Sequence, residues 1–555
     1  MTGGEVVAGR GVVSGSGADR AASGGAGLVP RSEPDGSWRP LGPVERWYWI
    51  TDQISPLNGV CVARVHARLP EKLWRAALDV LSARHPLLNV VIATDEDGAN
   101  PRFVPADGLS IPLRYELLEK TGESATPGEV GEPGEPGESG ATAEPYWVTE
   151  VNAHALVERV DPRSGPFARA VVLDRGTAGG RHPEQFLVLT VPHYVADGVS
   201  GLSLMREWIE AAAELEGHLP PSSATPGTPA TSGIPATSGI PATPATSGIP
   251  VTSTTPTAPG APCLPYRALP PVEELLPAAH RGDEGARRSR EQRTADAEAM
   301  AELRPLRVEP AHTVPFTERR TRLLHRELTP SQLGALVAAC RAEGTTVHGA
   351  LAAAMVTAVA RASGARGGEY VSIGSPVDFR GELDPPVLPQ EMGAYVATVP
   401  TIAPYRPDRP LWETARHISS DVAARKQRGE PFSAITTFGS MCPGTPAEAA
   451  PLLRFMDEEG PINLCLSNLG RVDFPDKIGP WEVSDAQLIA GLSVNGQFVG
   501  VVNTCHGHLF WNFTYIDGAL ADGAAEQLAD DCLTTLLSAL PDTPSVPNSP
   551  AKEGS

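Results

Sequence analysis

The chain has 555 residues, which is enough for two or more domains of ordinary size. Gly and Pro number 56 each and together make up about a fifth of the chain, whereas average proteins contain roughly 12% of the two. This excess excludes a uniformly compact body and predicts inserted segments without regular structure. The formal net charge of −21 argues against nucleic-acid binding, and its simplest role is solubility.

Seven cysteines are scattered along the chain without a C-x-x-C pair. Their odd number and wide spacing argue against a disulfide framework or a structural zinc site, so we expect reduced, mostly buried thiols. Residues 1–38 lack the apolar run of a signal peptide. No apolar run approaches the roughly 18 residues that a membrane span needs. The expected location is the cytoplasm.

The first ordered block is predicted to begin near residue 41. A β-rich run at 60–69 predicts a strand, and apolar residues at helical spacing predict a helix over 71–84 that ends before Pro86. The other elements predicted in this block are strands at 87–92, 167–173 and 186–191 and a helix over 198–216. An acidic Gly/Glu/Pro-rich stretch at 120–145 predicts a flexible surface loop.

A linker is predicted over 217–266, where no Asp, Glu, Lys or Arg occurs and the hexamer Ala-Thr-Ser-Gly-Ile-Pro appears three times. Such repeats also build β-helices, but three imperfect copies favour a linker. Residues 267–310 are predicted to form a charged helical connector whose arginine-rich stretch is either a solvated face or a docking face for an acidic partner. Residues 1–36 and 541–555 are predicted to be disordered tails.

The second ordered block is predicted over 311–540. Thr329, Pro330 and Gln332 form a capping-box pattern that starts a helix, and an Ala-rich helix is predicted over 347–362. Further predictions are strands at 319–328, 369–377, 394–401, 462–467, 498–504 and 509–515, with a hairpin turn at His506-Gly507, and helices over 411–425 and 519–540. The predicted fold class is therefore α/β, with two-layered lobes at 37–216 and 311–540.

The strongest local motif joins His193, Asp197 and Gly198 between a predicted strand and a predicted helix. Loops of this kind often bind ligands because rigid elements hold them in place. Imidazole exchanges protons near neutral pH, so His193 can act as a general base. Asp197 can hold the loop as a helix cap, and Gly198 permits close approach of a ligand. The spacing alone is equally consistent with a loop histidine that makes only structural hydrogen bonds.

Several motifs follow one another along the chain. They are Leu41-x-Pro43-x-Glu45, Arg84-His85-Pro86, His193-x-x-x-Asp197-Gly198, Pro376-Val377-Asp378-Phe379-Arg380, Met392-Gly393 and Ser467-Asn468-Leu469-Gly470. This ordered set resembles the chloramphenicol-acetyltransferase-like superfamily of acyltransferases, which includes condensation domains. It is most similar to the phthiocerol/phthiodiolone dimycocerosyl transferases. The resemblance covers about 41–216 and 311–540.

The resemblance implies two similar lobes that meet in a V, with a tunnel between them and His193 in its middle. It implies that a CoA or carrier-protein thioester donates an acyl group to a small alcohol, and that His193 deprotonates this alcohol. The product would be an ester in lipid or polyketide-type secondary metabolism. Neither a permanently bound cofactor, a metal nor a covalent enzyme intermediate is implied, and a monomer is expected.

The resemblance also implies roles for the other motif residues. Asp197 would pair with Arg380 across the fold and, with Gly198, support the site. Ser467 and Asn468 would lie on a loop near the tunnel and donate to the oxyanion, although a simple turn is an equal alternative. Pro192 occupies a position where condensation domains usually have a histidine, which favours ester formation over peptide formation.

Four further residues are weaker candidates for the site. Tyr194 is bulky and is expected to narrow the tunnel beside the base. His506 and His508 lack a third ligand for a metal, and His85 is expected to pack or cap rather than catalyse. Two alternatives to ester formation stay open: amide formation as in nonribosomal peptide synthesis, and a non-catalytic relative that binds a carrier protein.

Overall fold

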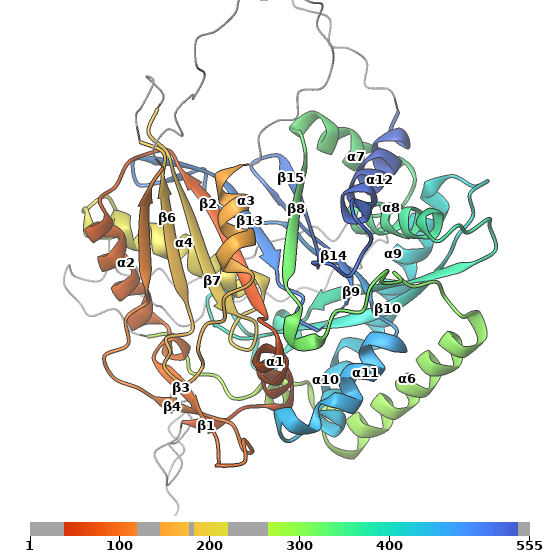
Figure 1. Ribbon diagram of the computed structural model, residues 1–555, viewed down its shortest axis with the longest axis horizontal. Helices are drawn as coiled ribbons and strands as arrows, with labels where there is room; N and C mark the ends of the chain where they lie inside the picture. The colour runs from red at the N-terminus through yellow and green to blue at the C-terminus, as the bar shows by residue number, and fades with distance from the viewer. Residues whose placement is uncertain (1–37, 119–144, 177–181, 220–264, 495, 542–555) are drawn as a thin grey trace, which may run out of the picture.

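A computed structural model describes residues 38–118, 145–176, 182–219, 265–494 and 496–541. The predicted tail 1–36 lies outside these ranges, as do nearly all of the loop 120–145, the linker 217–266 and the tail 541–555. Two mixed sheets lie side by side with helices on their outer faces (Figure 1). The predicted α/β fold class is therefore confirmed.

The first sheet has the strand order β12-β13-β2-β7-β6-β5. Its strands are β2 (Asn58–Val65), β5 (Leu113–Leu117), β6 (Arg169–Asp174), β7 (Gln185–Pro192), β12 (Lys477–Ile478) and β13 (Trp481–Ala490). One face packs against α2 (Glu71–Arg84) and α4 (Gly198–Leu215), and Trp74 and Trp208 meet edge-on between these helices. The other face packs against α3 (Tyr146–Glu150) through Trp147.

The chain crosses from the second half into the first sheet at β13. Val483 pairs with Val65 and Ala490 with Gly59, so β13 lies between β12 and β2 in the sheet. Figure 1 shows β13 beside β2. The sequence prediction assigned all of 311–540 to one lobe and missed this exchange. Local composition carries no signal for pairing between strands more than 400 residues apart, so the crossing is visible only in the fold.

The second sheet has the order β10-β9-β11-β14-β15-β8. Its strands are β8 (Thr321–Leu328), β9 (Tyr370–Asp378), β10 (Val396–Pro404), β11 (Leu464–Arg471), β14 (Phe498–Cys505) and β15 (His508–Ile516). Its outer helices are α7 (Pro330–Ala342), α8 (Val347–Ala362), α9 (Leu411–Gln427) and α12 (Ala524–Ser538). The alanines of α8 other than Ala362 at its end are buried, which allows close packing of the helix on the sheet.

Local signals in this half are confirmed. Thr329 accepts a hydrogen bond from the Gln332 backbone, and the Gln332 side chain accepts one from the Thr329 backbone, as a capping box requires. The turn between β14 and β15 has φ of 46° at His506 and 84° at Gly507. Two successive left-handed residues are typical of a tight hairpin turn.

Most of the remaining elements lie in the lower part of the molecule in Figure 1. They are a small sheet of β1 (Arg39–Pro40), β3 (Val90–Ala93) and β4 (Arg102–Pro105), and the helices α1 (Pro43–Ile54), α5 (Val272–Leu275), α6 (Gly282–Leu303), α10 (Glu430–Met441) and α11 (Ala450–Glu458). Helix α1 was not predicted, although Pro43 stands in its first turn and Val44, Trp47 and Thr51 follow helical spacing. The strand predicted at 87–92 is a short 3₁₀ turn at Pro86–Leu88 followed by β3.

The predictions for the end of the linker and for the connector that follows it need correction. Tyr266 was assigned to the linker, but its backbone N–H donates to the Arg84 carbonyl at 2.8 Å and its hydroxyl lies 3.1 Å from Glu207. The connector was predicted as a charged helix, yet its first part buries Leu269 and Val272 in an apolar cluster. The chain therefore packs onto the body from the first residues described after the linker.

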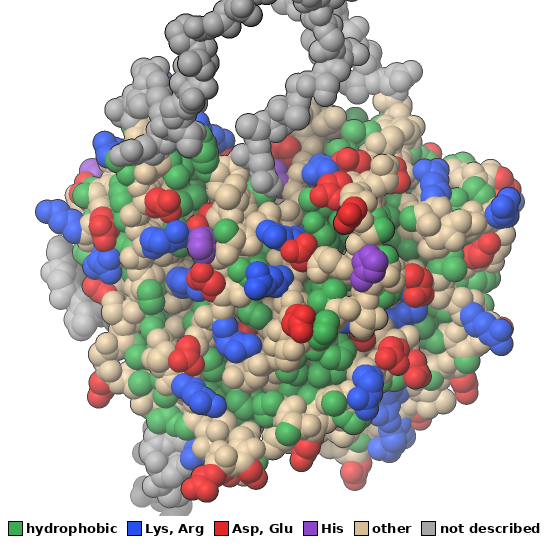
Figure 2. Space-filling view, viewed as in Figure 1, with side chains coloured by type: hydrophobic (Ala, Val, Ile, Leu, Met, Phe, Trp, Pro, Cys, Tyr) green, Lys and Arg blue, Asp and Glu red, His purple; other side chains and the backbone are tan. Residues whose placement is uncertain are grey.

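On the face of the molecule in Figure 2, Lys and Arg side chains are interspersed with Asp and Glu side chains, so no large area carries charge of a single sign. None of the helices in the described ranges combines the length and the apolar character needed to cross a membrane.

The strand exchange predicts that the halves do not fold separately. A fragment of residues 1–310 lacks β13, so the edge of β2 and its apolar neighbours would be exposed. We expect this fragment to show no cooperative thermal unfolding by circular dichroism, and co-expression with 311–555 to restore it. A fragment 1–310 that unfolds cooperatively on its own would contradict the exchange.

Candidate active site

The loop that carries His193 connects β7 to α4. The backbone N–H of His193 donates to the Leu57 carbonyl at 2.9 Å. Asp197 is the N-cap of α4, and its Oδ1 accepts the Ser200 N–H at 2.9 Å. A strand, a tight loop and a capped helix therefore hold His193 from both sides, as the sequence predicted.

The imidazole of His193 is half-buried, and its Nδ1 lies 3.1 Å from the carbonyl oxygen of Ala196. A carbonyl only accepts, so Nδ1 carries the proton and Nε2 has a free lone pair. Among the described residues Nε2 has no hydrogen-bond partner. Burial lowers the pKa of His193, although the charge of Asp197 opposes this, and the ring is neutral at neutral pH. These are the properties of a general base.

Tyr48 of α1 covers one face of this imidazole. The two ring centroids are 4.4 Å apart and the planes differ by 10°. The sequence prediction named Tyr194 as the aromatic beside the base, but Tyr194 is fully buried in the core of the first half and meets Phe167 edge-on. Tyr194 therefore does not narrow access to His193, and Tyr48 is a site residue that sequence reasoning missed.

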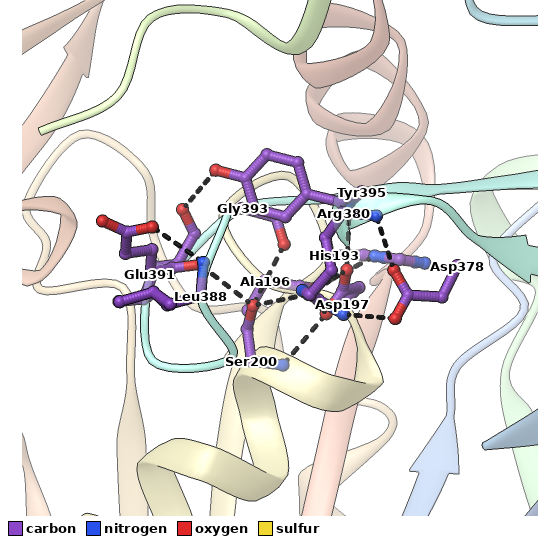
Figure 3. Close-up of polar contacts among 11 residues, drawn as sticks. His193, Ala196, Asp197, Ser200, Asp378, Arg380, Leu388, Glu391, Gly393 and Tyr395 are labelled. Atoms are coloured by element: carbon purple, nitrogen blue, oxygen red, sulfur yellow. Dashed lines mark hydrogen bonds and ion pairs between the residues drawn. The ribbon is translucent and has the colours of Figure 1, made fainter. Parts of the chain in front are cut away.

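The structure brings Asp197 and Arg380 together across the two halves (Figure 3). Nη2 of Arg380 lies 2.8 Å from both carboxylate oxygens of Asp197, and both side chains are buried. The Tyr395 N–H adds a hydrogen bond to Oδ2 at 3.0 Å. Burial opposes ionisation of Asp197, but Arg380 and the hydrogen bonds from Ser200 and Tyr395 outweigh it and hold its pKa below the usual value.

Arg380 is itself held at the end of β9. Its Nη1 lies 2.9 Å from Asp378, whose other carboxylate oxygen accepts the Arg380 backbone N–H at 3.0 Å. The backbone N–H of Asp197 donates to the carbonyl of Gly393 at 2.9 Å, which ties the loop before β10 to the loop that carries His193. Among the described residues, the side-chain hydrogen bonds of Asp197 go to Ser200, Arg380 and Tyr395 and not to His193.

Gly198 was predicted to permit close approach of a ligand, but in the structure it packs against leucine side chains of the second half. A Cβ at this position would collide with Leu488 of β13 and lie 2.9 Å from Leu469 of β11. Close packing of side chains from the second half requires this glycine, whereas the sequence prediction invoked close approach of a ligand. Gly198 thus marks the junction where α4, β11 and β13 meet.

Ser467 and Asn468 lie within β11 and not on a loop, because the strand continues to Arg471. Alternation along β11 sends Leu464 and Leu466 into the core of the second half, and Cys465 and Leu469 toward the first half. Ser467 shares the face that is directed toward the first half. Asn468 faces the other way, and its Oδ1 accepts the Gly470 N–H at 2.8 Å.

Other histidines are not brought to this site. His85 is buried, with Nε2 3.2 Å from Glu207 and its ring against Tyr266, which agrees with a packing role. His506 Nε2 lies 2.7 Å from the Phe474 carbonyl at the hairpin. Within the described residues no group of three or more His, Cys, Asp or Glu side chains is arranged for a metal.

Comparison with known proteins concerns the fold of the whole chain and the family of its second half. Residues 317–484 match the family model described as phthiocerol/phthiodiolone dimycocerosyl transferase C-terminus. A search of curated protein sequences gave no match. Polyketide synthase associated protein 5 from Mycobacterium tuberculosis is 15% identical, with a TM-score of 0.56, over 91% of this chain and 99% of that protein.

Two domains of peptide synthetases have the same fold. The first condensation domain of the calcium-dependent antibiotic synthetase is 14% identical with a TM-score of 0.58, over 90% of this chain and 96% of that one. The epimerization domain from the third module of tyrocidine synthetase B is 14% identical with a TM-score of 0.56, over 92% and 98%. At these identities the likeness concerns the fold.

The fold is therefore that of the two-lobed condensation domains. The family match in the second half is to dimycocerosyl transferases, which confirms the resemblance predicted from the ordered motifs. That family model describes transferases, whereas the same fold is also found in an epimerization domain.

Substitution of Asp197 tests how much the buried ion pair contributes to stability. Asp197→Asn keeps an oxygen for the Ser200 N–H but leaves Arg380 buried without its main counter-charge. We expect a loss of about 3–5 kcal/mol in the free energy of unfolding at pH 7, measured with urea. Asp378→Asn, at the more exposed partner of Arg380, should lose about 1 kcal/mol or less.

The pH dependence follows from the lowered pKa of Asp197. Its stabilisation is complete above the unfolded pKa of about 3.9 and is lost as pH falls through the lower folded value. Wild type should therefore lose stability below about pH 4 more steeply than Asp197→Asn. Equal acid profiles for the two proteins would contradict the assignment.

Proposed function

We propose that the protein is an acyltransferase that moves an acyl group from a CoA or carrier-protein thioester to an acceptor hydroxyl, with His193 as the general base. One observation carries the proposal. His193 presents a neutral imidazole with a protonated Nδ1, and with no partner for Nε2 among the described residues, at the junction of two lobes of the condensation-domain fold. The family match to transferases over 317–484 supports the reaction class.

In the proposed reaction the acceptor hydroxyl donates a hydrogen bond to Nε2 of His193. Nε2 takes the proton as the oxygen attacks the thioester carbonyl, and the imidazolium then returns it to the departing thiolate. The pair of substrates held together supplies much of the rate by proximity. No covalent enzyme intermediate and no permanently bound cofactor takes part in these steps.

The oxyanion of the tetrahedral intermediate needs a donor. The alternation of β11 favours Ser467, whose side chain shares the face directed toward the first half, over Asn468. Donor and acceptor are proposed to reach His193 from opposite sides, along a tunnel between the two lobes. Pro192 favours an alcohol over an amine as acceptor. We infer action as a monomer in the cytoplasm.

The test is thiol release from a panel of acyl-CoA and acyl-carrier-protein donors, with alcohol and amine acceptors. Wild type should release thiol with at least one donor only when an alcohol is present, and His193→Ala should lose about 10²–10⁴-fold of that rate. His508→Ala, at the hairpin outside the site, is the matched histidine control and should keep it.

Three results would contradict the proposal. Release that depends on amines and not on alcohols would identify amide formation. Full activity in His193→Ala would exclude His193 as the base. Silence across the whole panel, together with tight binding of the carrier protein, would identify a non-catalytic scaffold.

A further inference from the structure

The imidazole of His193 is restrained in two directions. The hydrogen bond from Nδ1 to the Ala196 carbonyl fixes the ring edge within its plane. The parallel contact with Tyr48, at 4.4 Å and 10°, fixes the tilt of that plane. A hydrogen bond alone leaves the ring free to tilt about the N–H···O axis, so the second restraint is what makes the direction of Nε2 unique.

Tyr48 is in turn held by a helix that is fastened at both ends. At the N-terminus of α1, the Val44 N–H donates to Oε1 of Glu273 at 3.0 Å, and Glu273 belongs to the segment that follows the linker. Near the C-terminus, the Ser493 hydroxyl oxygen lies 3.0 Å from the Thr51 carbonyl and 2.6 Å from the Ser55 carbonyl, and its single proton is shared between these two acceptors. These fastenings come from distant parts of the chain, so Tyr48 cannot shift without disturbing them.

The phenol of Tyr48 does not compete for the proton. Burial, with a contribution from the charge of Asp197, raises the pKa of Tyr48 to about 12, so the hydroxyl is neutral over the range in which an imidazole works. The nearby ionisable groups that act on the two rings are Asp197 and Cys465, and burial raises the pKa of the Cys465 thiol to about 12 as well. The hydroxyl of Tyr48 therefore takes no proton from His193, and Tyr48 acts on the imidazole through its ring.

We propose that Tyr48 is the positioning residue of this site: its ring holds the imidazole of His193 in the plane in which Nδ1 bonds to Ala196 and Nε2 points to the acceptor. The proposal rests on the proposed function of His193. It assigns to α1 the task of keeping the base in one tautomer and one direction. Binding of substrate does not depend on Tyr48 in this scheme.

The first test needs no substrate. With ¹⁵N-labelled histidine, nuclear magnetic resonance reports which ring nitrogen carries the proton, and a His193→Gln spectrum assigns the signal. Wild type should show His193 protonated at Nδ1 alone, and Tyr48→Phe should show the same. Tyr48→Ala should show a mixture of tautomers and a pKa of His193 moved up toward 6.5, because water reaches the exposed ring face.

The second test uses the thiol-release assay. Tyr48→Ala should lower kcat about 10- to 100-fold with little change in KM, since a misdirected base loses rate and not binding. Tyr48→Phe should restore most of the rate, which a structural role of the hydroxyl would not allow. Tyr48→Leu replaces the alanine variant if the latter does not fold. Phe455→Ala, at an exposed aromatic of α11, is the matched control.

The outcomes separate the two proposals. A single Nδ1–H tautomer with an unchanged pKa in folded Tyr48→Ala or Tyr48→Leu overturns the role of Tyr48, whatever the activity. Wild-type rates in these variants while His193→Ala is inactive also overturn it. Activity in His193→Ala overturns the proposed function of His193 instead.

Discussion

The buried ion pair between Asp197 and Arg380 joins the helix that follows His193 to the end of β9 in the other half. Removing two charges from water is unfavourable, and only the paired geometry with its extra hydrogen bonds from Ser200 and Tyr395 offsets it. The pair therefore enforces one arrangement of the halves. The loop that carries His193 takes its shape from that arrangement.

The strand exchange and the close packing at Gly198 act on the same junction. Strand β13 completes the first sheet from the second half, and its Leu488 fills the space that a side chain at position 198 would take. Helix α1 adds Tyr48 from the opposite side. His193, the strand β13 that packs beside its loop, and Tyr48 of α1 thus come from three segments far apart in the sequence. The site therefore forms only when both halves are assembled.

Local chemistry explains which parts the sequence could predict. The helices over 71–84 and 347–362 were predicted with their observed bounds, because periodicity, caps and a following proline act within a few residues. The pairing of Asp197 with Arg380 came only from the resemblance, and β13 and Tyr48 were missed. Each depends on contacts across hundreds of residues, for which a single sequence carries no local signal.

A double-mutant cycle on Asp197→Ala and Arg380→Ala measures the coupling between the two halves most directly. Arg380→Ala leaves Asp197 buried without a counter-charge, and Asp197→Ala leaves Arg380 with only the more exposed Asp378, while the double variant removes both buried charges. The account predicts that the double variant loses no more free energy of unfolding than either single one, and that all three lose the single tautomer of His193. Losses that simply add, with the tautomer kept, would contradict it.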